Sequence, residues 1–422
     1  MKINEGRPSP GAWLVVALLW FVAGFNYLDR VMVATMHRSL VTAIPMTDAQ
    51  FGLLTSGFLW VYGLLGPLGG YLADRFSRSK MILVSMFTWS ATTWLTAHAT
   101  TFNELLATRA LMGISEAAYL PAALALIADY HRGPTRSFAT GVHMTGILAG
   151  SALGGLGGLL AEGRGWSHPF SLFGIIGVAY CGVLVFALRD APREEEGPPA
   201  GGETGARPRF GAAIASLFSR GSFVVLFVFW GVGAVVGWSV TGWMPTYLME
   251  HFHLAQGRAG LTATVSSSAA SFLGVLVGGA WADRWSRTQP RARILVPAIG
   301  ICLAVPGILL ASNTSVLVFA ILGLVLYGLT RAFTDSNLMP ILCMISNPRY
   351  RATGYGVLNM IANIIGGLSI YAGGMLRDRH IDVTRVFEFG AGGMVVCAAL
   401  LMFVNRQSRL SEVERVAPNT LV

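Results

Sequence analysis

Long apolar runs separated by short polar breaks fill most of this chain. Each run has roughly the 20 residues that a helix needs to cross a hydrocarbon core of about 30 Å. Segments in lipid must satisfy their own backbone hydrogen bonds, and the short alternating strands of a membrane barrel do not occur here. The pattern predicts an all-α integral membrane protein. We expect twelve transmembrane helices, at residues 12–36, 49–73, 81–100, 103–130, 137–161, 168–188, 222–249, 257–282, 293–312, 314–340, 352–376 and 385–405.

One long polar stretch interrupts the apolar runs after the sixth of them. It is rich in proline, glycine and charge, which is typical of a flexible linker, and it includes a short apolar segment at 210–219 that favours a surface helix. We therefore predict five parts: an N-terminal tail at 1–11, a six-helix bundle at 12–188, the linker at 189–221, a second six-helix bundle at 222–405 and a C-terminal tail at 406–422.

The two halves also resemble each other in sequence. Residues 69–78 read GGYLADRFSR, and residues 278–287 read GGAWADRWSR. A second, weaker match joins 136–142 (RSFATGV) to 351–357 (RATGYGV). Both matches fall at equivalent places in the halves. An internal duplication of six-helix units is typical of secondary transporters, in which the two halves are related by pseudo-symmetry.

Composition supports a membrane location. Only 12% of the 422 residues are charged and the mean hydropathy is +0.59, so a soluble protein of this size could not cover its surface. The net charge of +9 comes from Lys and Arg that gather in the tails, the linker and the loops on the same side. The positive-inside rule then places both termini in the cytoplasm. We expect a multi-pass protein of the cell (inner) membrane that contacts the lipid bilayer and no nucleic acid.

The repeated motif puts an aspartate and several arginines where a helix leaves the bilayer on the inside. An aspartate there can face the positive end of a neighbouring helix or pair with an arginine, and such contacts can form and break as a gate opens. The positive-inside rule alone explains the arginines but not an aspartate repeated in the same register. We predict a cytoplasmic gate made of Asp74, Arg75, Arg78, Arg136, Asp283, Arg284, Arg287 and Arg351.

This motif resembles the loop signature of the major facilitator superfamily, G-x-x-x-D-R-x-G-R-K, with Ser77 where the family usually has glycine. The resemblance covers essentially the whole chain: twelve runs, two halves, a central linker and the second motif copy. It implies two bundles that rock around a central site lined by spans 1, 4, 7 and 10, and it says nothing by itself about the substrate.

Ionisable residues inside the apolar runs are costly and by default functional. Helical spacings of three, four and seven place them on single faces of spans 1, 4 and 10. Protonating two of the carboxylates would leave surplus positive charge that attracts an anion. Six static buried charges would be poor stabilisers, which disfavours a purely structural role. The ionisable residues and the asparagine that shares their face are Asn26, Asp29 and Arg30, then Arg109, Glu116 and Tyr119, and finally Tyr327, Arg331 and Asp335.

We assign proton coupling to Asp29 and Glu116, and a role as charge partner or substrate contact to Arg30, Arg109, Arg331 and Asp335. Depth along the helices, at about 1.5 Å per residue, puts Asp29 level with Arg109, where the two could pair. Further cavity candidates are Asn26, Tyr62, Tyr119, His143, Trp238, Tyr327, Asn359 and Asn363. For His143, the tryptophan and the asparagines, simple packing or lipid contact is the alternative.

Residues 26–30 (NYLDR) and 109–119 resemble motifs shared by the anion:cation symporters and the Spinster-type lipid transporters. The first branch implies a small organic anion such as a sugar acid or carboxylate, which is our first choice. The second implies a lysolipid or sphingoid amphiphile. Drug efflux and a non-transporting receptor are further alternatives. Span 5 lacks the Gly-Pro pair of drug antiporters, and its glycines at 146, 150 and 154 predict a close-packing seam.

Enzyme motifs are absent from the sequence: it has no phosphate-binding Walker loop and no His-Glu-x-x-His zinc motif. The four cysteines are widely spaced within apolar runs, so we read them as buried hydrophobic residues. We therefore expect a monomeric transporter, not an enzyme, without metal or cofactor and with the proton as its coupling ion.

Overall fold

The computed structural model describes residues 11–131, 135–191, 210–289, 291–346 and 350–416, which are helical apart from the connecting turns and contain no strand. The first half contains α1 (Ala12–Thr35), α2 (His37–Ala43), α3 (Asp48–Arg75), α4 (Arg78–Thr96), α5 (Phe102–Glu116), α6 (Tyr119–Tyr130), α7 (Arg136–Leu153), α8 (Leu156–Arg164) and α9 (Ser167–Ala187). The remainder contains α10 (Phe210–Phe218), α11 (Gly221–His251), α12 (Gln256–Ser286), α13 (Ala292–Asn313), α14 (Leu317–Ile345), α15 (Arg351–Asp378) and α16 (Thr384–Val416).

Eleven segments of the described chain are long and apolar enough to cross a membrane, which confirms the all-α membrane class. Among the described helices of 18 residues or more, α4 is outside this set, because its serines, threonines and basic first turn lower its hydropathy. The twelfth span therefore stays a prediction, and so do the five-part boundaries and the side on which the termini lie. The short helix expected at 210–219 is α10.

Two predicted spans are each built from two helices. The span at 103–130 breaks between α5 and α6, where the ring of Pro121 is incompatible with a helical hydrogen bond to the carbonyl of Ala117. The span at 137–161 breaks between α7 and α8 at two glycines, Gly154 and Gly155. The last helix, α16, continues to Val416, beyond the expected end of the span at 405, because no proline or glycine interrupts it there.

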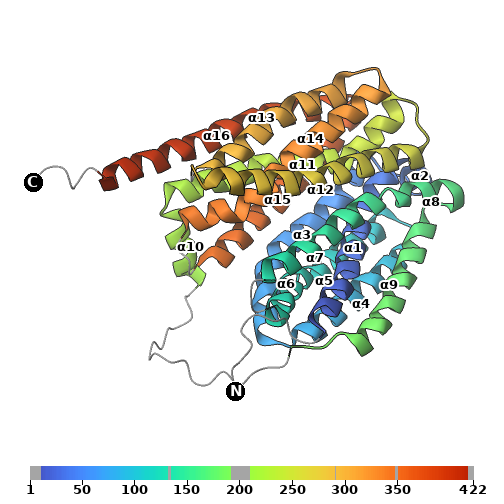
Figure 1. The fold of residues 1–422 in the computed structure, drawn as a ribbon. Coiled ribbons are helices and arrows are strands. Elements are labelled where there is room, and N and C mark those ends of the chain that lie inside the picture. Colours follow the sequence, from blue (N-terminus) through green and yellow to red (C-terminus); the bar gives the residue numbers. More distant parts are fainter. Residues whose placement is uncertain (1–10, 132–134, 192–209, 290, 347–349, 417–422) are drawn as a thin grey trace, which may run out of the picture.

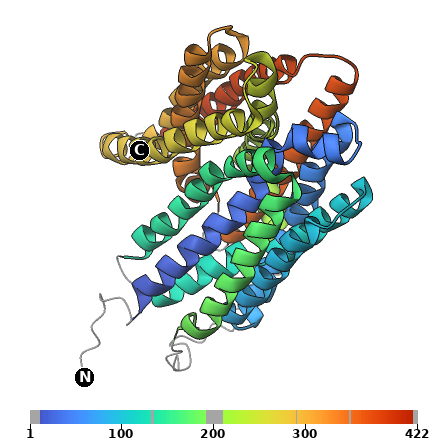
Figure 2. The ribbon, with the colours of Figure 1, turned by 90° about the vertical axis from the view of Figure 1, so that its right-hand side faces the viewer.

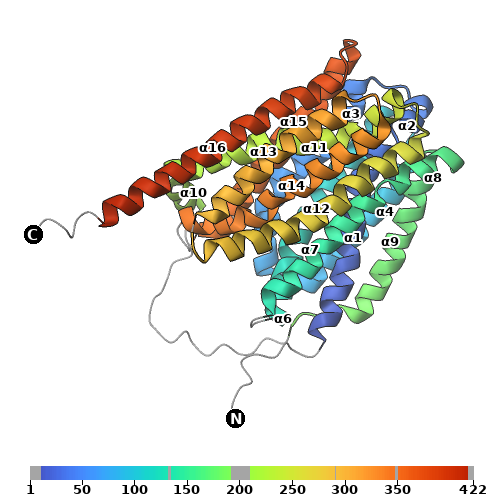
Figure 3. The same cartoon turned by 45° about the horizontal axis from the view of Figure 1, so that its top comes forward.

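Figure 1 shows α1–α9 and α11–α16 as two groups of helices inclined to each other, with α2 and α8 at the end where the groups converge. Two seams join them. In the first, α3 lies beside α15 (Figure 3). In the second, α7 lies between α1 and α12 (Figure 2), and α8 also contacts α12.

Small residues let these helices approach closely. A Cβ atom on Gly146, Gly150 or Gly154 would collide with α1, so the glycine seam predicted for span 5 packs on that helix. On the other seam, a Cβ atom on Gly52 would lie 2.9 Å from the carbonyl oxygen of Ile370. The glycines thus bring α7 against α1 and α3 against α15.

Candidate functional site

The centre of the first half contains a buried ion pair between two helices. Arg30 of α1 donates from Nη2 to Oε2 of Glu116, the last residue of α5, at 2.9 Å, and the side chains are 2% and 0% exposed. The same Nη2 donates to Oδ1 of Asn26 at 3.2 Å, one helical turn earlier. Asn26 and Arg30 therefore share a face, as their spacing predicts.

Aromatic rings enclose the guanidinium of this pair. The Arg30 Cζ atom lies 4.5 Å from the ring centroids of Tyr27 and Tyr62 and 4.8 Å from that of Phe58. Rings at these distances attract the cation and exclude water from it. The cage holds the Arg30 side chain in one place, so Glu116 has a fixed cationic partner.

The second carboxylate of the first half, Asp29, is bound differently. Its Oδ2 accepts a hydrogen bond at 3.1 Å from the hydroxyl of Thr93 in α4, and its side chain is buried. Its Oδ1 has no hydrogen-bond partner. A buried carboxylate without an ion pair is costly when charged, so this position favours a proton on Asp29.

Asp29 and Arg109, which lie at the same depth, do not form an ion pair in this conformation. Arg109 instead reaches across to α3, where Nε donates to the carbonyl of Leu54 at 3.4 Å and the guanidinium lies 4.9 Å from the Phe58 ring. Its Nη1 lies 3.3 Å from the sulfur of Met112. Equal depth in the bilayer did not imply contact, because the two helices turn these side chains toward different neighbours.

Several polar atoms of this cluster lack a partner although they are buried. Since buried polar atoms are normally hydrogen-bonded, this concentration makes the cluster the candidate site of the first half. The unpartnered atoms are Asn26 Nδ2, Asp29 Oδ1, Arg30 Nε, Arg109 Nη2 and Glu116 Oε1.

The second half carries a more open pair on α14. Arg331 Nη2 donates to Asp335 Oδ2 at 2.8 Å, and the two side chains are 33% and 35% exposed. Tyr327, one turn before Arg331, is buried and its hydroxyl has no partner. The predicted face of span 10 therefore exists as one continuous polar strip.

The remaining cavity candidates of the first half are Tyr119 and His143. The Tyr119 hydroxyl donates to the carbonyl of Leu19 at 3.1 Å, so the break before α6 directs this residue toward α1. Its ring centroid lies 6.2 Å from that of His143, which is buried with both ring nitrogens unpartnered.

The candidates of the second half lie on α11 and α15. Trp238 lies against Gly366, and Asn363 donates from Nδ2 to the carbonyl of Asn359 at 2.7 Å. Asn363 also lies against Gly63 of α3, so this asparagine lines the α3–α15 seam.

The residues predicted for the cytoplasmic gate bond mainly within their own halves. Arg78 pairs with Asp129, and Arg75 donates to the Tyr71 hydroxyl at 2.7 Å. Asp283 pairs with Arg293 at 3.2 Å, and Arg136 donates to the carbonyl of Ala128. Arg284 and Arg287 are exposed. The side chains of Asp74 and Arg351 lie outside the described residues, so the gate itself stays a prediction.

A further carboxylate at this end escaped sequence reasoning. Asp190 accepts the backbone N–H of Ser79 at 2.7 Å, at the start of α4. Burial raises the pKa of Asp190, but hydrogen bonds from Ser77 and Ser79 outweigh this effect and hold the pKa below its usual range. The contact ties the end of α9 to α4 and so strengthens the first half alone.

Sequence reasoning also missed other residues of the central site. Thr93, Tyr27 and Phe58 complete the surroundings of the charged cluster. The dense serines and threonines of α4 were a signal for Thr93, since hydroxyls in a span seek buried partners. No comparable signal pointed to the rings.

Membrane-crossing helices in two groups, with a cluster of buried charges inside the first group, are the architecture of a multi-pass membrane transporter of small molecules. The family model described as Major Facilitator Superfamily matches residues 19–370, and the chain belongs to this superfamily.

Three relatives align over most of the chain. The MFS-type efflux pump of Mycolicibacterium smegmatis is 25% identical and covers 92% of this chain and 90% of its own. The sphingosine-1-phosphate transporter SPNS2 of Mus musculus is 28% identical, with coverages of 92% and 77%. The probable sulfoacetate transporter SauU of Cupriavidus necator is 26% identical, with coverages of 93% and 92%.

Among solved structures, the inward-facing, occupied form of a bacterial homolog to the human lysosomal transporter Spinster has the same fold. Its TM-score is 0.77 at 22% identity, and the match covers 95% of this chain and 98% of that one.

Proposed function

We propose that this protein is a proton-coupled secondary active transporter of a small organic anion, such as a sugar acid or carboxylate, in the cell (inner) membrane. The observation behind the proposal is the buried cluster of Asp29, Arg30, Arg109 and Glu116. The cluster is neutral when all four groups are ionised. Adding protons to both carboxylates leaves two positive charges in a buried site, which an anion would neutralise.

Coupling follows from this charge balance. A proton on Glu116 weakens its bond to Arg30, and the freed guanidinium then needs another anion. Arg331 lies on the facing half and is partly exposed, so it is the natural second contact for a substrate anion. Releasing the substrate and the proton restores the internal pair.

The names of two relatives support an acidic substrate. SauU is named for sulfoacetate and SPNS2 for sphingosine-1-phosphate, and both compounds carry an anionic group. SPNS2 favours the second candidate function, the transport of a lysolipid or sphingoid amphiphile.

The test uses purified protein in liposomes with an imposed pH gradient. We expect labelled carboxylates or sulfonates to accumulate above their outside concentration, and a protonophore to abolish the accumulation. Uptake of lysolipid alone would favour the second candidate. Saturable binding without any exchange of labelled substrate would contradict transport and indicate a receptor. We also propose that the protein transports its substrate as a monomer and without a cofactor.

A further inference from the structure

A single arginine ties the two halves together at the end of the molecule that charge distribution predicts to be outside. Arg377 of α15 donates from Nε to Oδ2 of Asp48 in α3 at 3.0 Å. Its Nη1 and Nη2 donate to Oε2 and Oε1 of Glu250 in α11 at 2.9 and 2.8 Å. Its guanidinium lies 5.3 Å from the ring of Trp243. Such paired hydrogen bonds between charges hold a defined geometry.

The neighbouring residue, Asp378, completes a helix of the other half. Its carboxylate accepts the backbone N–H groups of Asp48 and Ala49, the first two residues of α3, at 2.8 and 3.0 Å. Thr47 and Gln50 form a capping box that satisfies other N–H groups at this end. The first turn of α3 therefore depends partly on the second half, and a negative charge there is favourable.

A polar contact also closes the second seam at the same end. Gln256, at the start of α12, accepts the Ser39 N–H at 2.9 Å and donates to the Ser39 hydroxyl at 2.8 Å. It also donates to the carbonyl of Gly158 at 3.2 Å. Beside it, the N–H of Gly257 donates to Glu162 at 3.0 Å. Both seams thus carry hydrogen bonds between the halves.

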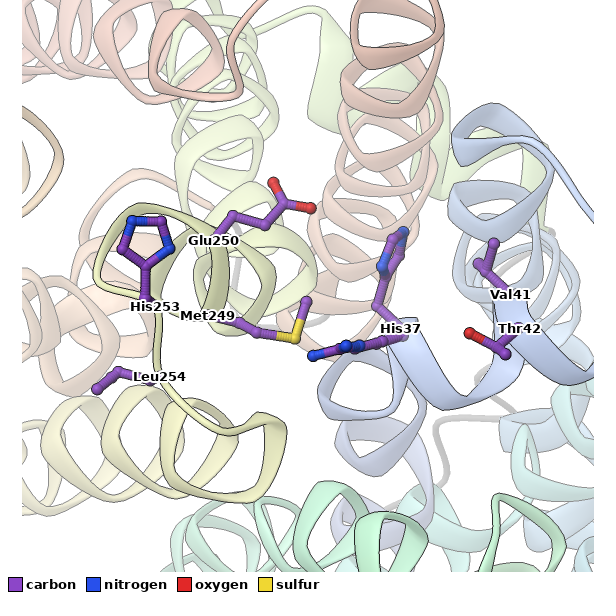
Figure 4. Close-up of a pocket in the computed structure, with 8 residues that line it drawn as sticks. His37, Val41, Thr42, Met249, Glu250, His253 and Leu254 are labelled. Carbon is purple, nitrogen blue, oxygen red and sulfur yellow. The ribbon is translucent and has the colours of Figure 1, made fainter.

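A cavity of about 460 Å³ at this end is lined from both halves and includes Glu250 of the Arg377 contact in its wall. Figure 4 shows His37, Val41 and Thr42 on one side and Met249 and Glu250 on the other. Nε2 of His37 lies 2.6 Å from Oδ1 of Asp48. Moving the halves apart here would open this cavity and break the contacts of Arg377 and Asp378 together.

We propose that Asp48, Glu250, Arg377 and Asp378 form an outer latch, with Ser39 and Gln256 as its second part, and that this latch holds the outer mouth closed. At the opposite end, the ion pairs Arg78–Asp129 and Asp283–Arg293 of the described residues each stay within one half. The latch is only half-buried, so its charges become hydrated when it opens and it can break in every transport cycle. The proposal needs only that the two halves move and does not depend on the coupling ion or the substrate.

The test measures whether a residue behind the latch can be reached from outside. Thr246 is 1% exposed and lies on the face of α11 that carries Trp243 and Glu250, by spacings of three and four. Thr246→Cys should react slowly with a membrane-impermeant maleimide. Adding Arg377→Gln or Asp378→Asn should speed labelling about tenfold, because lost charge-assisted hydrogen bonds shift the population toward the open mouth. The labelling rate with Arg377→Lys should lie between the rates with Arg377 retained and with Arg377→Gln.

The matched control is Arg385→Gln. Arg385 pairs with Glu388 at 2.8 Å near the start of α16, so this change removes a pair of the same kind within a single helix. Labelling of Thr246→Cys should then change by less than about twofold. Protein with Thr246 retained measures the background from the native cysteines. An equal rise in the control, or no rise in either latch variant, would overturn the proposal.

A covalent test works without charge changes and covers the case in which the latch variants fold poorly. The side chains of Ser39 and Gln256 touch, so a short bifunctional methanethiosulfonate should bridge the thiols of Ser39→Cys/Gln256→Cys across the shorter cysteine side chains. The bridge should abolish maleimide labelling of Thr246→Cys in the same protein, and a reductant should restore it. Undiminished labelling of Thr246→Cys with the bridge formed would refute the latch.

Discussion

The two halves each contain an arginine–carboxylate pair within the predicted membrane, but the surroundings of the pairs differ. Arg30–Glu116 joins α1 to α5, and its side chains are 2% and 0% exposed. Arg331–Asp335 lies within one turn of α14, and its side chains are 33% and 35% exposed. An enclosed pair responds strongly to a proton because no water screens the change, whereas an open pair is available to a solute. We therefore assign coupling to the first pair and substrate contact to the second.

The largest expected effect comes from removing the enclosed carboxylate. Glu116→Gln should abolish pH-gradient-driven accumulation, because the neutral amide can no longer exchange a proton for the Arg30 contact. Substrate exchange at equal concentrations should survive, since it needs no net proton movement. Uptake and counterflow in liposomes measure both. Asp335→Asn is the matched control and should retain accumulation; if Glu116→Gln concentrates substrate as well as the unmodified protein, the assignment of coupling is wrong.

A second difference should appear in stability. Arg30→Gln leaves Glu116 buried without its cation, which costs about 3–5 kcal/mol in free energy of unfolding if the carboxylate stays charged. Arg331→Gln removes a partly hydrated pair and should cost less than about 1 kcal/mol. Thermal unfolding in detergent compares the two. The double variant Arg30→Gln/Glu116→Gln should recover most of the loss, and equal losses in Arg30→Gln and Arg331→Gln would remove the distinction between the pairs.

The spans and the charged faces could be predicted from the sequence because both depend on local spacing. Asn26 and Arg30 lie one turn apart, and Arg331 and Asp335 do as well, so their contacts follow from helical periodicity. The partner of Arg109 could not be predicted. Periodicity gives the face of one helix, but the rotation of two helices about their axes depends on packing throughout the bundle.

The outer latch was missed for a related reason. Asp48 and Arg377 fall just outside the predicted spans, and they are 329 positions apart in the chain. Each residue alone looks like an ordinary loop charge. Only the convergence of α3, α11 and α15 brings them together, and no local pattern contains that information.

The open pair should matter most for binding. Arg331→Gln should weaken binding of an anionic substrate about tenfold, because one charge-assisted contact is lost. The pH dependence of uptake should stay unchanged. Isothermal titration on purified protein gives the affinity. Asp335→Asn is the control, since it leaves the cation in place and should not weaken binding. Weaker binding in Asp335→Asn than in Arg331→Gln would contradict a substrate role for the arginine.

The smallest effect concerns the hydrogen bond to the second buried carboxylate. The Oγ1 atom of Thr93 lies 3.1 Å from Oδ2 of Asp29 and 3.0 Å from the carbonyl oxygen of Trp89, so these two acceptors share its one proton, and the side chain is fully buried. Thr93→Val keeps the shape but removes the donor, which should lower the free energy of unfolding by about 1 kcal/mol. The pH at which uptake is half-maximal should shift upward, because a charged Asp29 loses a hydrogen bond that stabilises it. Thr93→Ser keeps the hydroxyl and should leave that pH in place. A shift of equal size in the serine and valine variants would mean that Thr93 acts on Asp29 through packing and not through its hydrogen bond.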